Sequence, residues 1–244
     1  MDNNYCLRLE NLSFRFSPAS PHFFKNIEIE FSPHKLNFIQ GKNGSGKSTL
    51  FRIMQGQIAP QEEISGVFHF NDQIFTITNN ESSNRSFGSS VALVHQNVTV
   101  MIADQFTFEQ NLQYAAMPKY PGLSALSKLK SLPPFVETLG LDYAKPVDRM
   151  SGGQKQILAI LMALQKDTRI LLLDEPTAAL DEKNANLIMH FLQELAKTTN
   201  ILIIIISHDQ QLMSSYKELS AFFLVEEDVK SKERRVKRVD KELF

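Results

Sequence analysis

Residues 41–49, with the sequence GKNGSGKST, have the residue types and spacing of a phosphate-binding loop. The glycines allow a tight turn that points successive backbone N–H groups inward, and a helix beginning there adds its positive end. Lys47 can reach the outer phosphates of a nucleotide, and the hydroxyl of Ser48 can bind Mg²⁺. The spacing therefore favours a polyphosphate site over a merely flexible glycine turn. The predicted binding residues are Gly41, Lys42, Asn43, Gly44, Ser45, Gly46, Lys47, Ser48 and Thr49.

A second chemical element is the acidic pair at the end of ILLLDEP, Asp174 and Glu175. Ligands of open α/β sheets bind at the carboxyl ends of strands, and successive residues there point in different directions. Asp174 can therefore bind Mg²⁺ while Glu175 faces an attacking water as general base. Such a pair also occurs as a simple strand end, but the phosphate loop favours the catalytic interpretation.

The segment MSGGQKQ, residues 150–156, predicts a capped helix N-terminus. Ser151 and Gln154 have the spacing of a capping box, and the apolar residues that follow lie on one helical face. The free N–H groups and the helix dipole would form a second anion site, which Gly152 and Gly153 would let a ligand approach closely. An ordinary capped helix is the alternative interpretation.

Taken together, the three motifs resemble those of the ATP-binding-cassette ATPases, whose signature is LSGGQ. The resemblance covers essentially residues 5–210, and the motifs occur in the family's order. It implies that two subunits enclose two ATP molecules with Mg²⁺, head to tail, so that Ser151, Gly152, Gly153 and Gln154 contact the nucleotide of the partner.

Further site residues follow from the same resemblance. Gln96 matches a glutamine that contacts Mg²⁺ and water, Asp181 a residue at the dimer seam, and His208 a histidine that senses the γ-phosphate. On their chemistry alone these would be a surface amide, a helix N-cap and a structural histidine. Phe16 matches the aromatic residue that stacks on adenine, with Phe14 as the competitor if the register differs by two.

One position departs from the family. Ile157 stands where arginine is usual in the family. The change removes a charge near the dimer seam or the helical insertion but none of the phosphate-contacting groups, so we expect activity to persist. The catalytic set is then Lys47, Gln96, Glu175 and His208, and the Mg²⁺ ligands are Ser48, Gln96 and Asp174.

The apolar pattern supplies the elements that must position these residues. Residues 35–40, 169–174 and 201–207 read as strands, the last two buried on both faces, with a helix over 184–197 between them. The predicted fold is α/β, a P-loop NTPase of the RecA-like type with a parallel-sheet core. An N-terminal antiparallel β subdomain and an inserted helical subdomain complete it.

Other segments complete the predicted organisation. Residues 78–90 are polar and read as an exposed loop, and residues 91–96 as a strand. Short helices broken by prolines are predicted after Phe108, at 108–116, 124–130 and 133–140. We expect an ATP-binding domain over 1–225, with its helical insertion at about 97–150. The charged tail, 226–244, reads as a solvated helix or frayed end.

Composition limits the partners. The 26 basic and 27 acidic residues among 244 leave a net charge of −1, so no general affinity for nucleic acid is expected. A single cysteine, Cys6, excludes a disulfide framework. No apolar run approaches the roughly 18 residues that cross a bilayer, and the first residues do not resemble a secretory signal.

The resemblance therefore implies a cytoplasmic protein that is peripheral on the inner membrane. Its expected partners are a second ATPase subunit, most simply a homodimer, an integral membrane permease and an extracytoplasmic substrate-binding protein. The segments ILAILMALQ, FTFEQNL and DEPTAALD resemble those of a bacterial subgroup that accompanies importers of amino-acid-like solutes. A soluble ATPase in cofactor assembly, a regulator that no longer hydrolyses ATP and a P-loop kinase are the alternatives.

Overall fold

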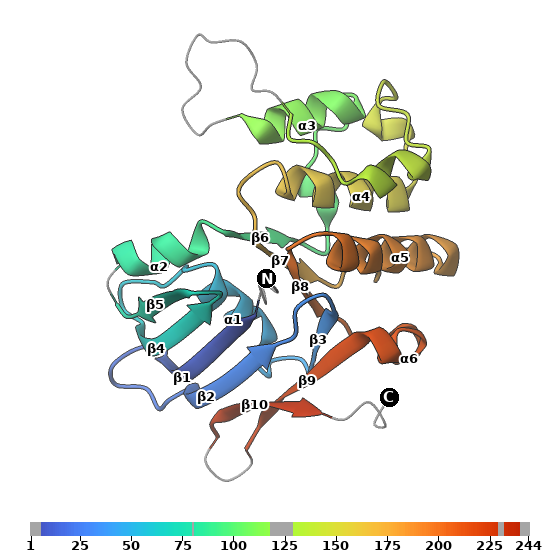
Figure 1. The fold of residues 1–244 in the computed structure, drawn as a ribbon. Coiled ribbons are helices and arrows are strands. Elements are labelled where there is room, and N and C mark those ends of the chain that lie inside the picture. Colours follow the sequence, from blue (N-terminus) through green and yellow to red (C-terminus); the bar gives the residue numbers. More distant parts are fainter. Residues whose placement is uncertain (1–5, 80, 118–128, 229–231, 240–244) are drawn as a thin grey trace.

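The computed structural model describes residues 6–79, 81–117, 129–228 and 232–239, whose strands form one mixed ten-stranded sheet (Figure 1). The strand order is β5-β4-β1-β2-β10-β9-β3-β8-β7-β6. The strands are β1 (Leu7–Arg15), β2 (Phe24–Phe31), β3 (Leu36–Gln40), β4 (Glu63–Phe70), β5 (Gln73–Ile77), β6 (Val91–Val94), β7 (Ile170–Asp174), β8 (Leu202–Ile206), β9 (Ser220–Glu227) and β10 (Arg234–Val239).

Helices cover both faces of the sheet (Figure 1). The α-helices are α1 (Lys47–Met54), α2 (Glu81–Gly88), α3 (Phe108–Ala116), α4 (Gly152–Ala163), α5 (Glu182–Thr198) and α6 (Gln210–Ser215). Short 3₁₀ helices are η1 (Val98–Val100), η2 (Pro134–Leu139), η3 (Val147–Arg149) and η4 (Lys217–Leu219). Among the described residues, no helix combines the length and the apolar character needed to cross a membrane.

The parallel half of the sheet is buried on both faces, as predicted. Strands β6, β7, β8, β3 and β9 run parallel, and successive residues of β7 enter different cores. Leu171 and Leu173 pack with α4 and α5, whereas Ile170 and Leu172 pack with α1. This explains why the strand is apolar without alternation: each of its side chains meets a helical layer.

The N-terminal half is antiparallel, also as predicted. β1 pairs with β2 and β4, and β4 pairs with β5 in a hairpin. Between β6 and α4 the described residues carry η1, α3, η2 and η3, which confirms a helical insertion in the α/β framework. The helix predicted at 108–116 is α3, and the one at 133–140 is the 3₁₀ helix η2. The one at 124–130 lies mostly outside the described residues.

Two local predictions are wrong. Residues 78–90 do not form an exposed loop, because residues 81–88 form α2, in which Phe87 is fully buried against Phe68 and Phe75. Asn84 is also buried and bonds to the backbone of Thr78. One aromatic anchor thus holds an otherwise polar helix on the sheet.

The charged tail is neither a helix nor a frayed end over its described part. Residues 234–239 form β10, which pairs antiparallel with β9 and places its first residue beside Phe24 of β2. Cross-strand ion pairs join Arg234 to Glu227 at 3.2 Å and Lys237 to Glu226 at 2.7 Å. Opposite charges placed across an antiparallel pair stabilise it, which is why so charged a sequence forms a strand.

Candidate functional site

A cavity of about 600 Å³ lies where β3, β7 and β8 end, at the same edge of the sheet. Residues far apart in the sequence meet there because parallel strands present their carboxyl ends together. Most of the residues predicted from the phosphate loop line it, as do the acidic pair and His208. The lining residues are Phe23, Asn43, Gly44, Gly46, Lys47, Ser48, Thr49, Gln96, Asp174, Glu175, Ala178, Ile206 and His208.

The phosphate loop joins β3 to α1, and its conformation requires glycine. Gly44 has φ +77° and Gly46 has φ +111°, values that L-residues with side chains rarely adopt. A Cβ on Gly46 would lie 2.7 Å from Cε1 of Phe23, so the aromatic ring rests directly on the loop. Gly41, Lys42 and Ser45 do not line the cavity; the two carbonyl groups at 41 and 42 face Lys47 instead.

Lys47 begins α1 and is almost fully buried. Its Nζ donates to the carbonyl oxygens of Gly41 at 2.7 Å and Lys42 at 3.2 Å. Burial lowers the pKa of the Lys47 ammonium, and the nearby carboxylates of Glu175 and Asp174 oppose that shift. The lysine therefore closes the loop on itself, and its charge is available to anionic oxygens entering the cavity.

Glu175 stands at the end of β7 in a left-handed conformation, with φ +50°. Its backbone N–H donates to the carbonyl of Ile206 on β8 at 3.0 Å, which fixes the strained turn. Nε2 of His208 lies 3.5 Å from Oε1 of Glu175, and the backbone N–H of His208 donates to Oε2 at 3.4 Å. Burial raises the pKa of the Glu175 carboxyl, and the neighbouring His208 opposes that rise.

This arrangement suits a general base. The raised pKa makes Glu175 a better proton acceptor than an ordinary exposed glutamate. Its Oε1 is buried and accepts no hydrogen bond from the described residues, although Nε2 of His208 lies 3.5 Å away. A buried carboxylate oxygen without a donor is costly unless a ligand or water supplies one. Oε1 can therefore accept a hydrogen bond from a molecule that enters the cavity.

Three oxygen-bearing side chains of the cavity fit Mg²⁺. Ser48, Gln96 and Asp174 all line it, and hydroxyl, amide and carboxylate oxygens are the donors that this hard cation prefers. Over the described ranges, no cluster of three or more His, Cys, Asp or Glu residues could hold a metal by itself. Such a donor set fits an ion that is shared with substrate phosphates and keeps several waters.

The helix predicted after residue 150 is α4, and its capping box is present. The hydroxyl of Ser151 accepts from the N–H of Gln154 at 3.2 Å, and the Gln154 side chain accepts from the N–H of Ser151 at 3.1 Å. Neither these residues nor Gly152, Gly153 and Asp181 line the cavity of their own chain. Their assignment to the nucleotide of a partner stays a prediction.

Close packing explains the second glycine of this segment. A Cβ on Gly153 would lie 2.5 Å from Oδ1 of Asn184, at the start of α5. Asn184 is in turn bound through its N–H at 2.8 Å and its Nδ2 at 2.8 Å to the carboxylate of Asp181, which caps α5. These hydrogen bonds lower the pKa of Asp181. The N-terminus of α4 thus packs closely against the N-terminus of α5.

The aromatic residue of the cavity wall is Phe23, which the sequence analysis did not single out. Phe14 is fully buried in the core. Phe16 is 44% exposed and does not line the cavity, but its ring meets Phe23 edge to face at 4.9 Å between centroids. The role of Phe16 in stacking on a base stays a prediction. The HFF run before β2 was the available signal for Phe23.

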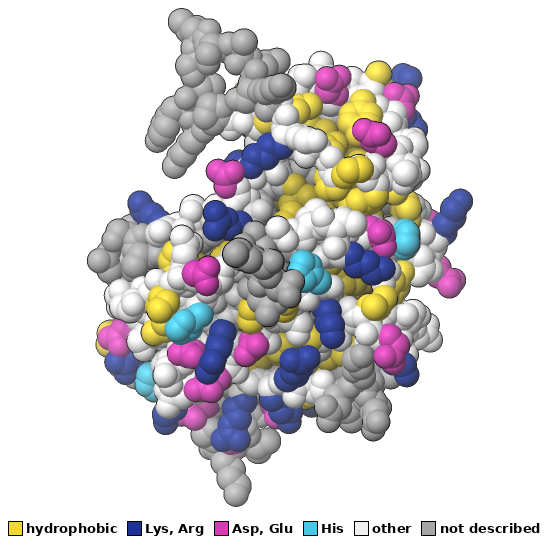
Figure 2. Space-filling view, in the orientation of Figure 1, with side chains coloured by type: hydrophobic (Ala, Val, Ile, Leu, Met, Phe, Trp, Pro, Cys, Tyr) yellow, Lys and Arg dark blue, Asp and Glu magenta, His cyan; other side chains and the backbone are white. Residues whose placement is uncertain are grey.

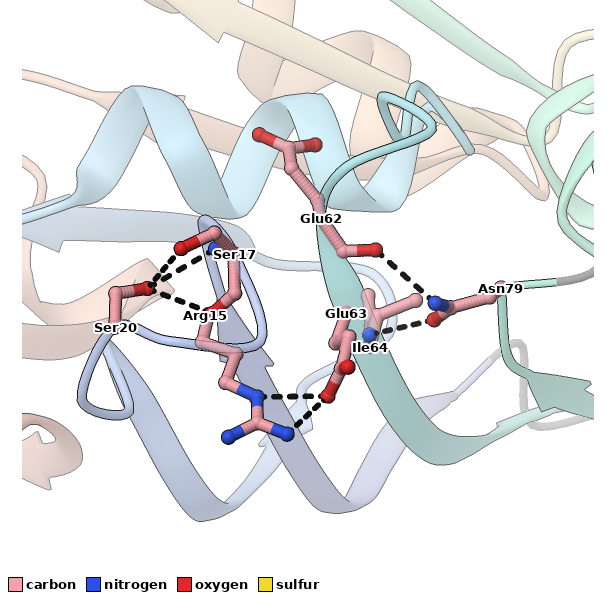
Figure 3. A network of polar contacts seen from close by, with 7 residues as sticks. All are labelled: Arg15, Ser17, Ser20, Glu62, Glu63, Ile64 and Asn79. Carbon is pink, nitrogen blue, oxygen red and sulfur yellow. Dashed lines mark hydrogen bonds and ion pairs between the residues drawn. The ribbon is translucent and has the colours of Figure 1, made fainter.

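The segment that carries Phe16 is anchored on both sides (Figure 3). Nε of Arg15 donates to Glu63 on β4 at 2.7 Å, and the hydroxyl of Ser20 accepts from the N–H of Ser17 at 3.0 Å. On the neighbouring strand end, the Asn79 side chain bonds to the backbone of residues 62 and 64. Phe16 therefore sits on a turn that has defined polar contacts.

The sheet order, the phosphate loop at β3 and the acidic residues at β7 define a P-loop nucleotide-binding fold. Comparison with known proteins makes this specific. The ABC transporter family matches residues 24–178, and the chain belongs to that family.

Similar proteins include several that are named import ATP-binding proteins. The methionine import ATP-binding protein MetN of Streptococcus agalactiae is 31% identical over 220 residues, covering 87% of this chain and 60% of MetN. The phosphonates import ATP-binding protein PhnC 1 of Ruegeria sp. is 30% identical, covering 87% of this chain and 83% of that protein. The chain thus spans about 60% of the length of its MetN relatives.

A solved structure supports the fold over nearly the whole chain. CbiO1 of Clostridium perfringens, described as part of the ABC transporter complex CbiONQ, superposes with a TM-score of 0.75 at 26% identity. The alignment covers 98% of this chain and 90% of CbiO1.

Proposed function

We propose that the chain binds Mg·ATP and hydrolyses it to ADP and phosphate, and that this drives transport by a separate membrane permease. The observation that carries the proposal is the convergence of Lys47, Asp174, Glu175 and His208 on one cavity beneath a glycine-rich phosphate loop. A phosphate loop alone binds; a buried carboxylate of raised pKa beside it can also activate water.

Each residue has a role in the proposed reaction. Backbone N–H groups of the loop and Lys47 hold the phosphates, and Glu175 accepts the proton of the attacking water. Lys47 and His208 stabilise the negative charge that develops on the transferred group. Ser48, Gln96 and Asp174 would hold Mg²⁺, which neutralises phosphate charge when bound.

We propose further that the working unit is a dimer. The capped N-terminus of α4 offers free N–H groups and a helix dipole, yet it does not line the cavity of its own chain. An anion site of this kind is useful if a second ATPase subunit, most simply a second copy, brings its nucleotide to it. Ser151, Gly152, Gly153, Gln154 and Asp181 would then complete the partner's site.

The proposed permease would dock on the helical insertion. Three large hydrophobic side chains there are exposed, Val100 by 73%, Phe106 by 44% and Tyr114 by 62%. Hydrophobic atoms are visible over the upper part of the molecule, which carries α3 and α4 (Figure 2). The names of the relatives, which include import proteins and part of a transporter complex, support this proposal.

Docking of this kind would place the protein on the cytoplasmic face of the inner membrane. An extracytoplasmic substrate-binding protein would complete an import system, and an amino-acid-like solute is the cargo class that we propose.

The proposal is tested by steady-state phosphate release from the purified protein, followed by affinity purification from solubilised membranes. We expect hydrolysis that rises with more than the first power of protein concentration, and an integral membrane protein that co-purifies. A protein that releases no phosphate would contradict the ATPase. Recovery without any membrane protein would favour a role in cofactor assembly.

A further inference from the structure

At one wall of the nucleotide cavity, two segments that are far apart in the sequence contact each other. Phe23, just before β2, lines the cavity, and its ring lies against the phosphate loop at Gly46. Arg234, the first residue of β10, lies beside it. Among the residues of β10, Arg234 is the one paired with β2, opposite Phe24. The C-terminal hairpin thus reaches the cavity wall.

Two contacts join Arg234 to Phe23. The backbone N–H of Arg234 donates to the carbonyl of Phe23 at 2.8 Å. The Cζ atom of Arg234 lies 4.3 Å from the centroid of the Phe23 ring, a cation–π distance. The first contact fixes the backbone before β2, and the second fixes the plane of the ring.

The guanidinium is itself held in place. Nη2 of Arg234 lies 3.2 Å from Oε2 of Glu227, and Nη1 donates to the carbonyl of Lys232 at 2.9 Å. Nε is buried and makes no hydrogen bond within the described parts of the chain. A guanidinium that leaves one donor unpaired while covering an aromatic ring is positioned by that ring as well as by its ion pair.

The ring has few other positions open to it. Phe16 and Phe24 both meet Phe23 edge to face, with centroids 4.9 and 5.0 Å away. The loop side is closed by Gly46. Arg234 covers a further side of the Phe23 ring. Removal of the Arg234 side chain would therefore let the ring turn away from the cavity.

We propose that Arg234 is a positioning residue for nucleotide binding: it orients Phe23 as the wall that receives the nucleoside part of ATP, so that the C-terminal strand helps to set nucleotide affinity. The inference rests on the proposed ATP site and adds a residue that none of the motifs contains. The overall charge of this surface does not explain the contact between Arg234 and Phe23. Basic and acidic side chains are mixed over the lower part of the molecule, where β9 and β10 lie (Figure 2).

The test compares two ligands on matched variants of the full chain. Dissociation constants are measured by calorimetry for Mg·ATP and for Mg·tripolyphosphate, which has no nucleoside. Arg234→Met keeps the length of the side chain but removes the planar cation. Arg235→Met, the neighbouring residue of β10, removes an exposed cation whose partner is Asp228 at 3.0 Å.

We expect Arg234→Met to weaken ATP binding roughly 3- to 10-fold, the loss of one cation–π contact converted to affinity, and to leave tripolyphosphate binding unchanged. Arg235→Met is expected to change neither. Phe23→Leu should weaken ATP binding similarly, and the double variant Phe23→Leu with Arg234→Met should lose no more than Phe23→Leu alone. Arg234→Lys, which keeps the ion pair but not the planar group, serves if the methionine variant does not fold.

Two results would overturn the inference while leaving the ATP site intact. One is wild-type ATP affinity in both Arg234 variants. The other is an equal loss for both ligands, because this would mean that Arg234 acts on the phosphate loop and not on the nucleoside wall. A wild-type protein that binds neither ligand would instead overturn the proposed function, and this inference with it.

Discussion

The two ends of the nucleotide cavity are built in different ways. At the phosphate end, short contiguous motifs follow β3, β7 and β8 and line the cavity, and a glycine-rich loop of this kind binds phosphate largely through backbone N–H groups. At the end where we propose that the nucleoside binds, side chains that are far apart in the sequence meet: Phe16 and Phe23 near β2, and Arg234 on β10.

Because of this difference, we expect the two ends of the cavity to differ in how well they tolerate amino-acid substitutions. Backbone donors and a buried lysine are positioned by the strand-to-helix turn, so a change there alters the chemistry of phosphate binding directly. An aromatic wall contributes contact area, and another apolar side chain replaces part of it. Substitutions at the phosphate end should therefore reduce ATP hydrolysis more than those at the proposed nucleoside end.

The largest effect is expected from Lys47→Ala. The variant loses the buried cation that donates to the loop carbonyls and faces the phosphates, so phosphate release should fall at least about 100-fold. Phe23→Leu, the matched change at the nucleoside end, should lower hydrolysis at saturating ATP by less than about 3-fold. Phosphate release is measured on both variants. An equally large fall in the rate for Phe23→Leu would contradict the proposed difference between the two ends of the cavity.

A smaller effect, on stability, tests whether the phosphate loop contacts the ring of Phe23. Gly44 and Gly46 both have positive φ, so alanine strains either position by about 1–2 kcal/mol. A Cβ at Gly44 meets no atom within 4 Å, whereas one at Gly46 collides with Phe23 and lies 3.0 Å from Phe24. The free energy of unfolding of Gly46→Ala should therefore be lower than that of Gly44→Ala by about 1–3 kcal/mol. Equal unfolding midpoints in urea would contradict the contact.

The same difference decides what could be predicted from sequence. The phosphate loop, Asp174, Glu175 and the capping box lie in contiguous segments whose local geometry follows from residue type and spacing. The strands at 169–174 and 201–207 could be predicted because burial on both faces makes their sequences apolar without interruption. Phe23 and Arg234 could not be paired in this way, since their contact depends on β10 lying between β9 and β2.

The two failed predictions have related causes. The polar composition of α2 hides the fact that Phe87 fills a space between two other phenylalanines. The charges of β10 suggest solvent on all sides, but their partners stand on the neighbouring strand. In both segments a long-range contact overrides a local preference.

Two capping boxes offer a matched pair for the proposed dimer. Thr107 with Gln110 caps α3 as Ser151 with Gln154 caps α4. Alanine at either cap should cost about 1 kcal/mol in the free energy of unfolding. Only Ser151→Ala should also slow phosphate release at a given protein concentration, because only the α4 terminus is proposed to meet the partner's ATP. Equal slowing by Thr107→Ala would argue against that role.

The smallest expected effect is a pH-dependent change in stability at Glu175. Burial raises the pKa of Glu175 in the folded protein above the 4.5 of an ordinary glutamate. The ionised form is then disfavoured by folding, so stability is lost as pH rises from the unfolded to the folded pKa. Glu175→Gln removes this cost and should raise the melting temperature at pH 7. The difference should vanish below about pH 4, where both states are protonated. A lower melting temperature at pH 7 would contradict the pKa direction.

The most direct test of the account is steady-state phosphate release from Glu175→Gln at saturating Mg·ATP, with ATP affinity measured on the same preparation. If Glu175 is the general base, the rate falls about 100-fold or more, the range of general base catalysis, while ATP affinity stays close to that of the wild type. A variant that binds ATP and still hydrolyses it at the wild-type rate would contradict the central claim.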